Sequence, residues 1–308
     1  MRKIFVMGGT GFVGRHVCEK LVRQGWHVTV PTRRLNNAKA VQHLPGLTVQ
    51  ELDVHHAASL AQAIAGHDAV VNLVAILHGS QAAFEKAHVS LPKILVQACQ
   101  DAGVKQVVHI SALGVNASNP QASPSNYLRS KGLGEQALAQ ADLNLSILRP
   151  SVIFGAEDQF LNLFAKLQKV FPVMPLAGAD ARFQPVWVQD VAAAVVQALQ
   201  PFARGNQHKV YELCGPDIYT LGELVQLAAR LSSTTGRTRP VIPLPLWMGR
   251  VQALLMECAP GQPLMSRDNL DSMKVPNVAT GKLPDLQSLG INATALEPEA
   301  REYLARHA

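Results

Sequence analysis

The chain has 308 residues, of which 48% are hydrophobic and 16% charged, and it carries a formal net charge of +6. Its basic residues are scattered and Arg33-Arg34 is their longest cluster, so the sequence lacks the Lys/Arg runs that follow a nucleic-acid backbone, and we expect no nucleic-acid partner. The four cysteines are isolated and no Cys/His pair has metal-ligand spacing, which argues against a disulfide framework, predicts no metal and favours the reducing cytoplasm.

Strand and helix patterns alternate through the first half of the chain. Apolar or alternating runs predict strands at 3–7, 27–32, 47–54, 68–76, 106–111 and 143–150. Helical spacing predicts helices at 14–25, 59–66, 91–104 and 126–141. We therefore predict an α/β fold of the Rossmann type, a doubly wound parallel sheet with helices on both faces. Ligands of such sheets bind at the carboxyl ends of the strands.

The rhythm loosens after Pro150, and prolines become frequent near the C-terminus. Helical spacing predicts helices at 160–170, 186–200 and 221–232, with a short strand at 209–215. The resulting domain prediction is a Rossmann dinucleotide-binding domain over 1–155 and a smaller, irregular C-terminal cap over 156–308, with 183–200 returning to the Rossmann core.

The first strand runs directly into GGTGFVG and then into a helix. Gly8 suits a tight turn, Gly11 lets the backbone approach a phosphate, and Gly14 permits close packing of the helix on the strand. Free amides and the positive end of the helix dipole attract a pyrophosphate there. A glycine-rich connection without a ligand is the alternative, but the strand–turn–helix context favours a dinucleotide. Thr10 can hydrogen-bond within the turn, and we predict cofactor contacts at Gly8, Thr10, Gly11, Phe12, Val13 and Gly14.

The end of the second predicted strand, VPTRR, indicates which dinucleotide is bound. Thr32 stands where NAD sites usually carry an acidic residue for the ribose 2′-hydroxyl, and Arg33 and Arg34 follow it. A guanidinium binds a 2′-phosphate through paired, charge-assisted hydrogen bonds, whereas a carboxylate repels it. Two solvated surface arginines are the alternative. We predict NADP(H), with NAD(H) as the less favoured cofactor.

Tyr127 and Lys131 stand four residues apart in the predicted helix 126–141, so their side chains share one face. Such a lysine can bind the nicotinamide ribose, and its charge lowers the pKa of the tyrosine toward that of a useful general acid or base. The spacing is common by chance and gains meaning from its place after the fifth strand. We predict catalytic and cofactor-binding roles for both residues and for Ser111, a hydroxyl donor at the end of that strand.

Other polar residues have ordinary structural interpretations. His55-His56 would diverge on a helix and are interpreted as surface residues, and His109 in a buried strand as a satisfied core histidine. Asp190 is expected to cap the helix that it precedes. The acidic residues that offer an alternative carboxylate pair for acid–base chemistry are Glu157, Asp158 and Asp190.

With these motifs together, the chain resembles the short-chain dehydrogenase/reductase superfamily, in its extended or atypical branch. The resemblance covers nearly two-thirds of the chain and rests on GGTGFVG, LDV (52–54), NLVA (72–75), HIS (109–111), YLRSK, RPSVIFG (149–155) and PVWVQDVA (185–192). It implies cofactor contacts that run from the adenine through the middle to the nicotinamide: Asp53 and Val54, then Leu73, Val74 and Ala75, then Pro150 to Ile153.

A narrower resemblance extends over nearly the whole length. YLRSKGLGE, IFGAEDQFLNLFA (153–165), PLPLW (243–247) and LPDLQSLGINATALEPEA (283–300) are similar to the NADPH-binding accessory subunit family of respiratory complex I, the α-subcomplex subunit 9 type, with its bacterial relatives. This resemblance implies a tightly bound NADPH and a role in holding an assembly together, without established turnover.

One departure from the superfamily concerns catalysis. Leu113 stands where active extended members usually place a Ser or Thr, and leucine cannot polarise a carbonyl. The segment from Ser111 to Tyr127 is also shorter than usual. Two hypotheses therefore stay open: an NADP(H)-binding protein whose Tyr127 and Lys131 serve cofactor binding alone, and an active NAD(P)H-dependent oxidoreductase or epimerase/dehydratase acting on a small carbonyl or quinone-like substrate.

The segment 241–257 is apolar and framed by prolines, with Trp247 and Arg250 near its middle. The simpler interpretation is a cap helix packed on the sheet; the functional alternative is docking to a membrane respiratory complex or to a membrane surface. No apolar stretch reaches the roughly 18 residues of a spanning helix, and no secretory signal precedes the first strand. We expect a cytoplasmic protein, with a peripheral position at the inner face of the membrane as the alternative.

Overall fold

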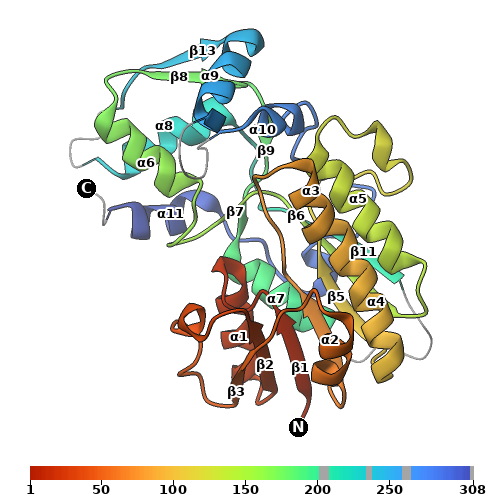
Figure 1. The fold of residues 1–308 in the computed structure, drawn as a ribbon. Helices are drawn as coiled ribbons and strands as arrows, with labels where there is room; N and C mark the ends of the chain where they lie inside the picture. The colour runs from red at the N-terminus through yellow and green to blue at the C-terminus, as the bar shows by residue number, and fades with distance from the viewer. Residues whose placement is uncertain (201–207, 234–237, 259–264, 306–308) are drawn as a thin grey trace.

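The computed structural model describes residues 1–200, 208–233, 238–258 and 265–305, and a seven-stranded parallel sheet forms its core (Figure 1). The strands are β1 (Lys3–Met7), β2 (His27–Thr32), β3 (Leu47–Glu51), β4 (Ala69–Asn72), β5 (Gln106–Ile110), β6 (Asn144–Pro150) and β11 (His208–Leu213). Their order is β11-β6-β5-β4-β1-β2-β3, and the neighbours pair in parallel. The predicted doubly wound, Rossmann-type sheet is confirmed.

Helices cover both faces of this sheet. Those on one face are α1 (Phe12–Arg23) and α7 (Val188–Ala198), and those on the other are α2 (Ala57–Ile64), α4 (Leu91–Ala102) and α5 (Asn126–Ala139). The first layer packs through a buried aliphatic cluster that includes Val17 and Val195, and the second through a cluster that includes Leu60 and Leu95. Each such side chain stabilises the fold by roughly 1.5–3 kcal/mol on burial, so the two layers are held firmly.

The chain returns to the core over a longer stretch than the expected 183–200. After α7 it also contributes β11, which pairs in parallel with β6 and forms one edge of the main sheet. The strand predicted at 209–215 is therefore present, but it belongs to the Rossmann sheet and not to the cap. The backbone N–H of Glu212 in this edge strand donates to the carbonyl of Pro284 at 2.8 Å, so a later segment partly covers the edge.

Residues 81–90, for which the sequence pattern predicted no element, are helical. They form α3 (Gln81–Glu85) and a π-helical turn (Lys86–Ser90) that continues directly into α4. Pro92 stands in the first turn of α4, a position typical of a helix start. Pro92 has no N–H and cannot donate the regular hydrogen bond of an α-helix. The wider π-helical turn before it accommodates this missing bond.

The remaining elements form a smaller layer at one end of the sheet (Figure 1). Its helices are α6 (Leu161–Val170), α8 (Leu221–Leu231), α9 (Leu246–Cys258), α10 (Arg267–Ser272) and α11 (Leu296–Leu304). Its short strands pair as β7 (Ile153–Phe154) with β10 (Val186–Trp187), β9 (Arg182–Phe183) with β12 (Tyr219–Thr220), and β8 (Met174–Ala177) with β13 (Val241–Leu244). None of the helices in the described ranges is long and apolar enough to cross a membrane.

Two buried contacts hold helix α5, which carries Tyr127 and Lys131, in its position on the sheet. The Glu135 carboxylate accepts hydrogen bonds from Arg149 on β6, from Nε at 2.9 Å and from Nη2 at 2.5 Å. A Cβ at Gly134 would lie 2.1 Å from the carbonyl oxygen of His88, so only glycine lets α5 approach the π-helical turn this closely. These contacts set the position of the catalytic candidates relative to the end of β5.

Candidate functional site

The turn between β1 and α1 brings backbone amides to the carboxyl edge of the sheet. Gly8 has a φ of +80°, in the left-handed region, and a Cβ there would lie 3.1 Å from the backbone carbonyl carbon of Leu73. A Cβ at Gly14 would lie 2.2 Å from the carbonyl oxygen of Gly8. The tight turn and the close helix packing predicted for these two glycines are therefore present.

The N-terminus of α1 is suited to an anion. Its N-cap is Gly11, which has no side chain to accept from the first-turn amides, and the first turn contains no acidic residue. The amides of this turn, at Phe12, Val13 and Gly14, therefore keep their donors, and the helix dipole adds positive potential. Thr10 lies in the preceding turn. These residues stay the predicted contacts of a pyrophosphate.

The strand order brings further predicted cofactor residues to the same edge. Those that follow the neighbouring strands are Arg33 and Arg34 after β2, Asp53 and Val54 after β3, and Leu73, Val74 and Ala75 after β4. Arg33 and Arg34 are exposed, whereas Thr32 is buried and its Oγ1 donates to the carbonyl oxygen of Arg34 at 3.0 Å. The Asp53 carboxylate accepts the backbone N–H of His55 at 3.0 Å.

Asn72 and His109 hold the loop that follows β4. Asn72 accepts the backbone N–H of Val74 at 3.1 Å and donates from Nδ2 to Nδ1 of His109 at 3.2 Å. Burial, with a contribution from the Lys131 charge, lowers the pKa of His109 well below its usual value. Nε2 of His109 has no hydrogen-bond partner among the described residues. The sequence predicted a core histidine with satisfied hydrogen bonds, and only Nδ1 has one here.

Two of the predicted catalytic residues lie at the end of β5. Lys131 is 1% exposed and donates from Nζ to the carbonyl oxygen of Ile110 at 2.8 Å. The next residue, Ser111, is 3% exposed, and within the described part of the chain its Oγ has no hydrogen-bond partner. Tyr127 is half-buried one helical turn before Lys131. The structure thus brings Ser111 next to Lys131 and places Tyr127 on the same helix.

Pro150 and Ile153, the residues expected beside the nicotinamide, lie at the end of β6 and in β7. Pro150 is joined to the strand end of β5 because its carbonyl oxygen accepts the backbone N–H of Leu113 at 2.9 Å. Leu113 itself is buried. The position where active relatives usually carry a hydroxyl is therefore filled here by an apolar side chain packed into the interior.

Burial governs the ionisation of Tyr127 and Lys131. It raises the pKa of Tyr127 to about 12, and it lowers the pKa of Lys131 to about 8 despite the opposing charge of Glu135. We expected Lys131 to lower the pKa of Tyr127. That expectation is wrong for the chain by itself, because burial disfavours the charged phenolate.

His88, in the π-helical turn, was missed by the sequence analysis. Its buried ring accepts the backbone N–H of Ile76 at Nε2, 3.1 Å away, and its Nδ1 lies 2.9 Å from Oγ of Ser130. That hydroxyl donates to the carbonyl oxygen of Tyr127 at 2.9 Å. Burial and the Lys131 charge lower the pKa of His88 to about 3. A π-helical turn often marks a functional site, but five residues are too few to reveal its period.

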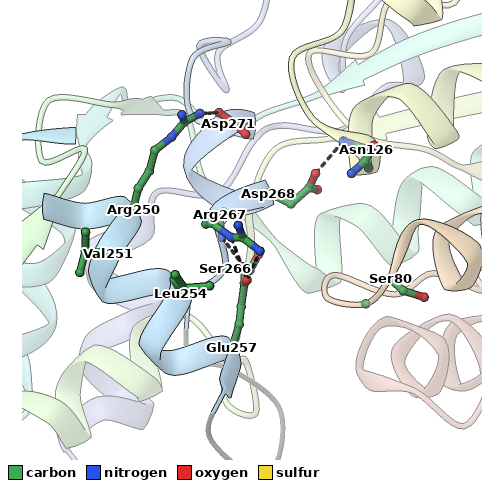
Figure 2. A pocket seen from close by; sticks show the side chains of 11 residues that line it. Ser80, Asn126, Arg250, Val251, Leu254, Glu257, Ser266, Arg267, Asp268 and Asp271 are labelled. Carbon is green, nitrogen blue, oxygen red and sulfur yellow. Dashed lines mark hydrogen bonds and ion pairs between the residues drawn. The ribbon is translucent and has the colours of Figure 1, made fainter. Parts of the chain in front are cut away.

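Asp268 of α10 was also missed. Its carboxylate accepts the backbone N–H of Asn126 at 2.6 Å and of Tyr127 at 3.0 Å, at the first turn of α5 (Figure 2). The N-cap Ser125 accepts the N–H of Leu128 at 3.1 Å, so the first-turn amides of α5 are satisfied by two side chains. A carboxylate is favourable at a helix N-terminus. The cap therefore holds the end of the helix that carries Tyr127.

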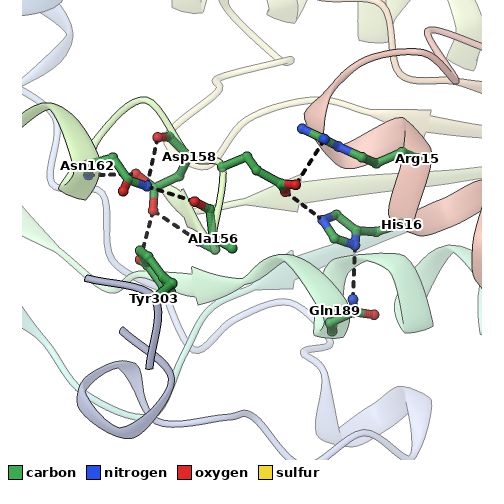
Figure 3. A network of polar contacts seen from close by, with 9 residues as sticks. Arg15, His16, Ala156, Asp158, Asn162, Gln189 and Tyr303 are labelled. Atoms are coloured by element: carbon green, nitrogen blue, oxygen red, sulfur yellow. Dashed lines mark hydrogen bonds and ion pairs between the residues drawn. The ribbon is translucent and has the colours of Figure 1, made fainter. Parts of the chain in front are cut away.

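Glu157 and Asp158 have separate partners, and Figure 3 shows Asp158 next to Asn162 and Tyr303. Asp158 is buried and accepts the backbone N–H of Gly155 at 3.1 Å and the hydroxyl of Tyr303 at 2.8 Å. Glu157 is half-exposed and pairs with Arg15 on α1 at 3.1 Å. The alternative that assigned acid–base chemistry to these carboxylates is therefore wrong: both side chains fix the loop after β7.

Asp190 does not cap α7, which corrects a further expectation. The helix begins at Val188 with Trp187 as its N-cap, and Asp190 lies in its first turn. Its carboxylate instead accepts the backbone N–H of Thr294 at 2.8 Å, which ties α7 to the segment before α11. Across the described ranges, no three His, Cys, Asp or Glu side chains gather in a way that could hold a metal ion.

Comparisons with known proteins point to one family. A family model described as NAD(P)H-binding matches residues 8–201. The chain is 35% identical to mouse (Mus musculus) mitochondrial NADH dehydrogenase (ubiquinone) 1 alpha subcomplex subunit 9, over 98% of this chain and 79% of that protein. The fold is similar to that of a nucleoside-diphosphate-sugar epimerase from Staphylococcus aureus, with a TM-score of 0.73 at 18% identity over 98% of this chain and 100% of the other. The Bordetella bronchiseptica enzyme WbmG in complex with NAD has a TM-score of 0.68 at 17% identity, over 99% and 93% of the two chains.

The ionisation of Lys131 predicts how stability depends on pH. Because its pKa of about 8 in the folded chain lies below the usual 10.5, the buried ammonium destabilises the fold fully below pH 8. Between pH 8 and 10.5 the folded chain loses this proton while the unfolded chain keeps it, so the free energy of unfolding gains at most about 1.4 kcal/mol per pH unit. Lys131→Met removes this gain. Urea unfolding of both proteins without nucleotide measures it, and a difference between them that does not change with pH contradicts the prediction.

Proposed function

The chain belongs to the NAD(P)H-binding family, and from this premise we propose that it holds one NADP(H) along the carboxyl edge of the seven-stranded sheet. The observation that carries the choice of NADP(H) is the exposed pair Arg33 and Arg34 directly after β2, where Thr32 replaces a carboxylate. Thr32 also fixes the turn on which both guanidinium groups stand. Two guanidiniums suit a 2′-phosphate, and the amides of α1 suit the pyrophosphate.

The remaining contacts follow the same edge. We place Asp53 and Val54 at the adenine, Leu73, Val74 and Ala75 along the middle, and Pro150, Ile153, Ser111, Tyr127 and Lys131 at the nicotinamide end. One of the three Nζ protons of Lys131 is used by the carbonyl of Ile110, so two are left for ribose hydroxyls. A ribose or amide oxygen would also give Ser111 the partner that its buried Oγ lacks within the described residues.

The cofactor preference is tested with Arg33→Ala. We expect NADP(H) affinity to fall about 10- to 100-fold, because one charge-assisted contact with the 2′-phosphate, roughly 1.5–3 kcal/mol, is lost. NAD(H) affinity should change less than about twofold, since NAD(H) has no phosphate there. Arg23→Ala is the matched control, because Arg23 is exposed on α1 and pairs only with Glu19 among the described residues. Titration calorimetry gives the constants, and equal losses for the two cofactors would reject the assignment.

We propose further that the bound NADP(H) stabilises the fold and is not turned over. Leu113 offers no hydroxyl beside the proposed nicotinamide end, and burial raises the pKa of Tyr127 to about 12 in the chain without nucleotide, which keeps the phenol protonated at pH 7. Proton abstraction, which an epimerase or dehydratase needs at its first step, is therefore disfavoured. A ligand at a hundredfold excess over its Kd stabilises the protein by about 2.7 kcal/mol, without any reaction.

The second candidate function is reduction of a small carbonyl or quinone-like substrate, and Ser111 favours it. Its buried Oγ is free to donate to a substrate oxygen, at least with respect to the described residues. Bound NADPH supplies the hydride in this chemistry. Tyr127, protonated at neutral pH, would donate its hydroxyl proton to the same oxygen, and the ammonium of Lys131 would stabilise the charge left on the phenol.

The two candidates are separated by loading the protein with NADPH and adding aldehydes, ketones and quinones. We expect the absorbance of the reduced nicotinamide to persist, and Tyr127→Phe to retain NADPH with an affinity within about threefold, since at most one neutral hydrogen bond is lost. Substrate-dependent loss of that absorbance, abolished in Tyr127→Phe, would instead establish the reductase. Loss of binding in Tyr127→Phe would contradict both assignments of this residue.

The apolar segment 241–257 supports a proposal about the partner. The large apolar side chains that it leaves exposed are Ile242, Leu246, Trp247, Met248, Val251, Leu254 and Leu255. So many large apolar side chains exposed on one segment are typical of an interaction site. The mouse relative carries the name of an NADH dehydrogenase subunit. We place this chain likewise against a membrane-bound respiratory NADH dehydrogenase, through 241–257, which makes it peripheral to the membrane.

The docking proposal predicts the behaviour of a double variant, Trp247→Ser with Leu255→Ser. These side chains are 67% and 68% exposed, so their loss should leave the fold and NADPH binding intact while it removes apolar contact area. We expect the unaltered chain to co-migrate with NADH dehydrogenase activity on native gels of mildly solubilised host membranes, and at least tenfold less of the double variant to do so. An unaltered chain that migrates alone would contradict the proposal.

A further inference from the structure

A cavity of about 830 Å³ lies between the cap and the nicotinamide end of the site (Figure 2). Its walls come from the start of α3, the start of α5, and the helices α9 and α10. The lining residues are Gly79, Ser80, Asn126, Arg250, Val251, Leu254, Glu257, Ser266, Arg267, Asp268 and Asp271. Asn126, one of these residues, stands in the first turn of α5 directly before Tyr127.

One wall of the cavity is apolar and is open to solvent. Val251 and Leu254 on α9 are 53% and 43% exposed, although both line the cavity. The helix packs on the cap through small residues, Gly249 and Ala253; a Cβ at Gly249 would lie 2.2 Å from Cβ of Ala177. The large side chains of α9 therefore point away from the cap core. An occupant with an apolar chain would cover this wall and remove its apolar surface from water.

Each charged side chain that lines the polar walls has a partner within the chain. Asp271 pairs with Arg250 and with Lys274, in each case at 2.7 Å, and Glu257 accepts from Nε of Arg267 at 2.9 Å. Asp268 is compensated by the first amides of α5. The two lining arginines thus face three lining carboxylates. A doubly charged diphosphate would find no net positive charge here, whereas a group with one positive and one negative charge would find partners for both.

The guanidinium groups keep donors for a ligand. In the described structure Arg250 uses one nitrogen for Asp271, and Arg267 uses two for Glu257, of the five N–H donors that each guanidinium carries. Both arginines are about half-exposed beside the cavity. Their free N–H groups are suited to the oxygens of one phosphate, and the Glu257 carboxylate to a nearby cation.

From these features we propose that the cavity binds a single-chain zwitterionic amphiphile. Its phosphate contacts Arg250 and Arg267, its cationic group faces Glu257, and its acyl chain lies along Val251 and Leu254 and leaves toward the exposed side of α9. This binding does not require the proposed nucleotide, and it uses Val251 and Leu254 of the surface that is proposed above for docking. It places a lipid head group at the cap side of the first turn of α5, where the charge balance disfavours a nucleotide-sugar.

The test uses the purified full chain and lauroyl lysophosphatidylcholine below its micelle concentration. We expect saturable one-to-one binding by titration calorimetry, with and without NADPH. Leu254→Glu should weaken this binding tenfold or more, because it places a charge on the apolar wall. Leu255→Glu is the matched control on the same helix: Leu255 is exposed but does not line the cavity, so its variant should bind within about twofold of the unaltered chain.

Four comparison ligands identify which part of the lysophospholipid the cavity recognises. Glycerophosphocholine, inorganic phosphate, a neutral sugar detergent and UDP-glucose should each bind at least tenfold more weakly than the lysophospholipid. Val251→Ser gives a second, milder test of the wall, and NADPH affinity measured on every variant shows whether the nucleotide site is intact. Absent or non-saturable binding, equal losses for Leu254→Glu and Leu255→Glu, or equal affinity for any one of the four comparison ligands would each overturn the proposal. Loss of NADPH binding alone would count against the proposed function and not against this cavity.

Discussion

The close approach of α1 to the turn that follows β1 is the constraint on which the candidate site depends. Gly14 lies so near the carbonyl oxygen of Gly8 that a Cβ would come within 2.2 Å of it. This contact brings the first turn of α1 over the carboxyl edge of the sheet, beside the ends of β2 and β4. Donors from a helix and guanidiniums from a neighbouring strand then share one edge, which suits a phosphorylated dinucleotide. The family assignment supports a dinucleotide at this edge.

Helix α5 transmits this arrangement to the cap. Its middle is fixed by Glu135 against Arg149, and its N-terminus by Asp268, a residue 142 positions away from Asn126. The cap is therefore more than a cover for the cleft, since it supplies a carboxylate that completes the first turn of the helix bearing Tyr127. A shift of α10 would move Tyr127 relative to Ser111, because Asp268 of α10 binds the Tyr127 amide and Ser111 directly follows β5 of the sheet. Helix α5 in this way connects the cavity, the cap and the candidate site.

The sequence predicted what depends on local pattern and missed what depends on distant contacts. Alternating strands and helices identified β1 to β6 and α5, and the glycine spacing identified the turn at Gly8. His88 and Asp268 had no local signal, because one stands in a short π-helical turn and the other acts across 142 positions. The pKa of Tyr127 was expected to fall because burial, unlike spacing, cannot be read along a chain. Strands β8 and β13, of four residues each, were too short to show a period.

The burial of Lys131 links occupancy of the site to the stability of the fold. Its ammonium is nearly fully enclosed, and the compensation that the described residues give it is the carbonyl of Ile110 and the charge of Glu135, which is committed to Arg149. A ligand with hydroxyl acceptors and phosphate charge would favour the ammonium form and so stabilise the protein, whereas an apolar ligand would not. Burial likewise keeps Tyr127 protonated, because it raises the pKa of the phenol. Both effects support the proposal that the nucleotide stabilises the fold, and they leave Tyr127 suited to donate a proton, as the proposed reduction requires, rather than to abstract one.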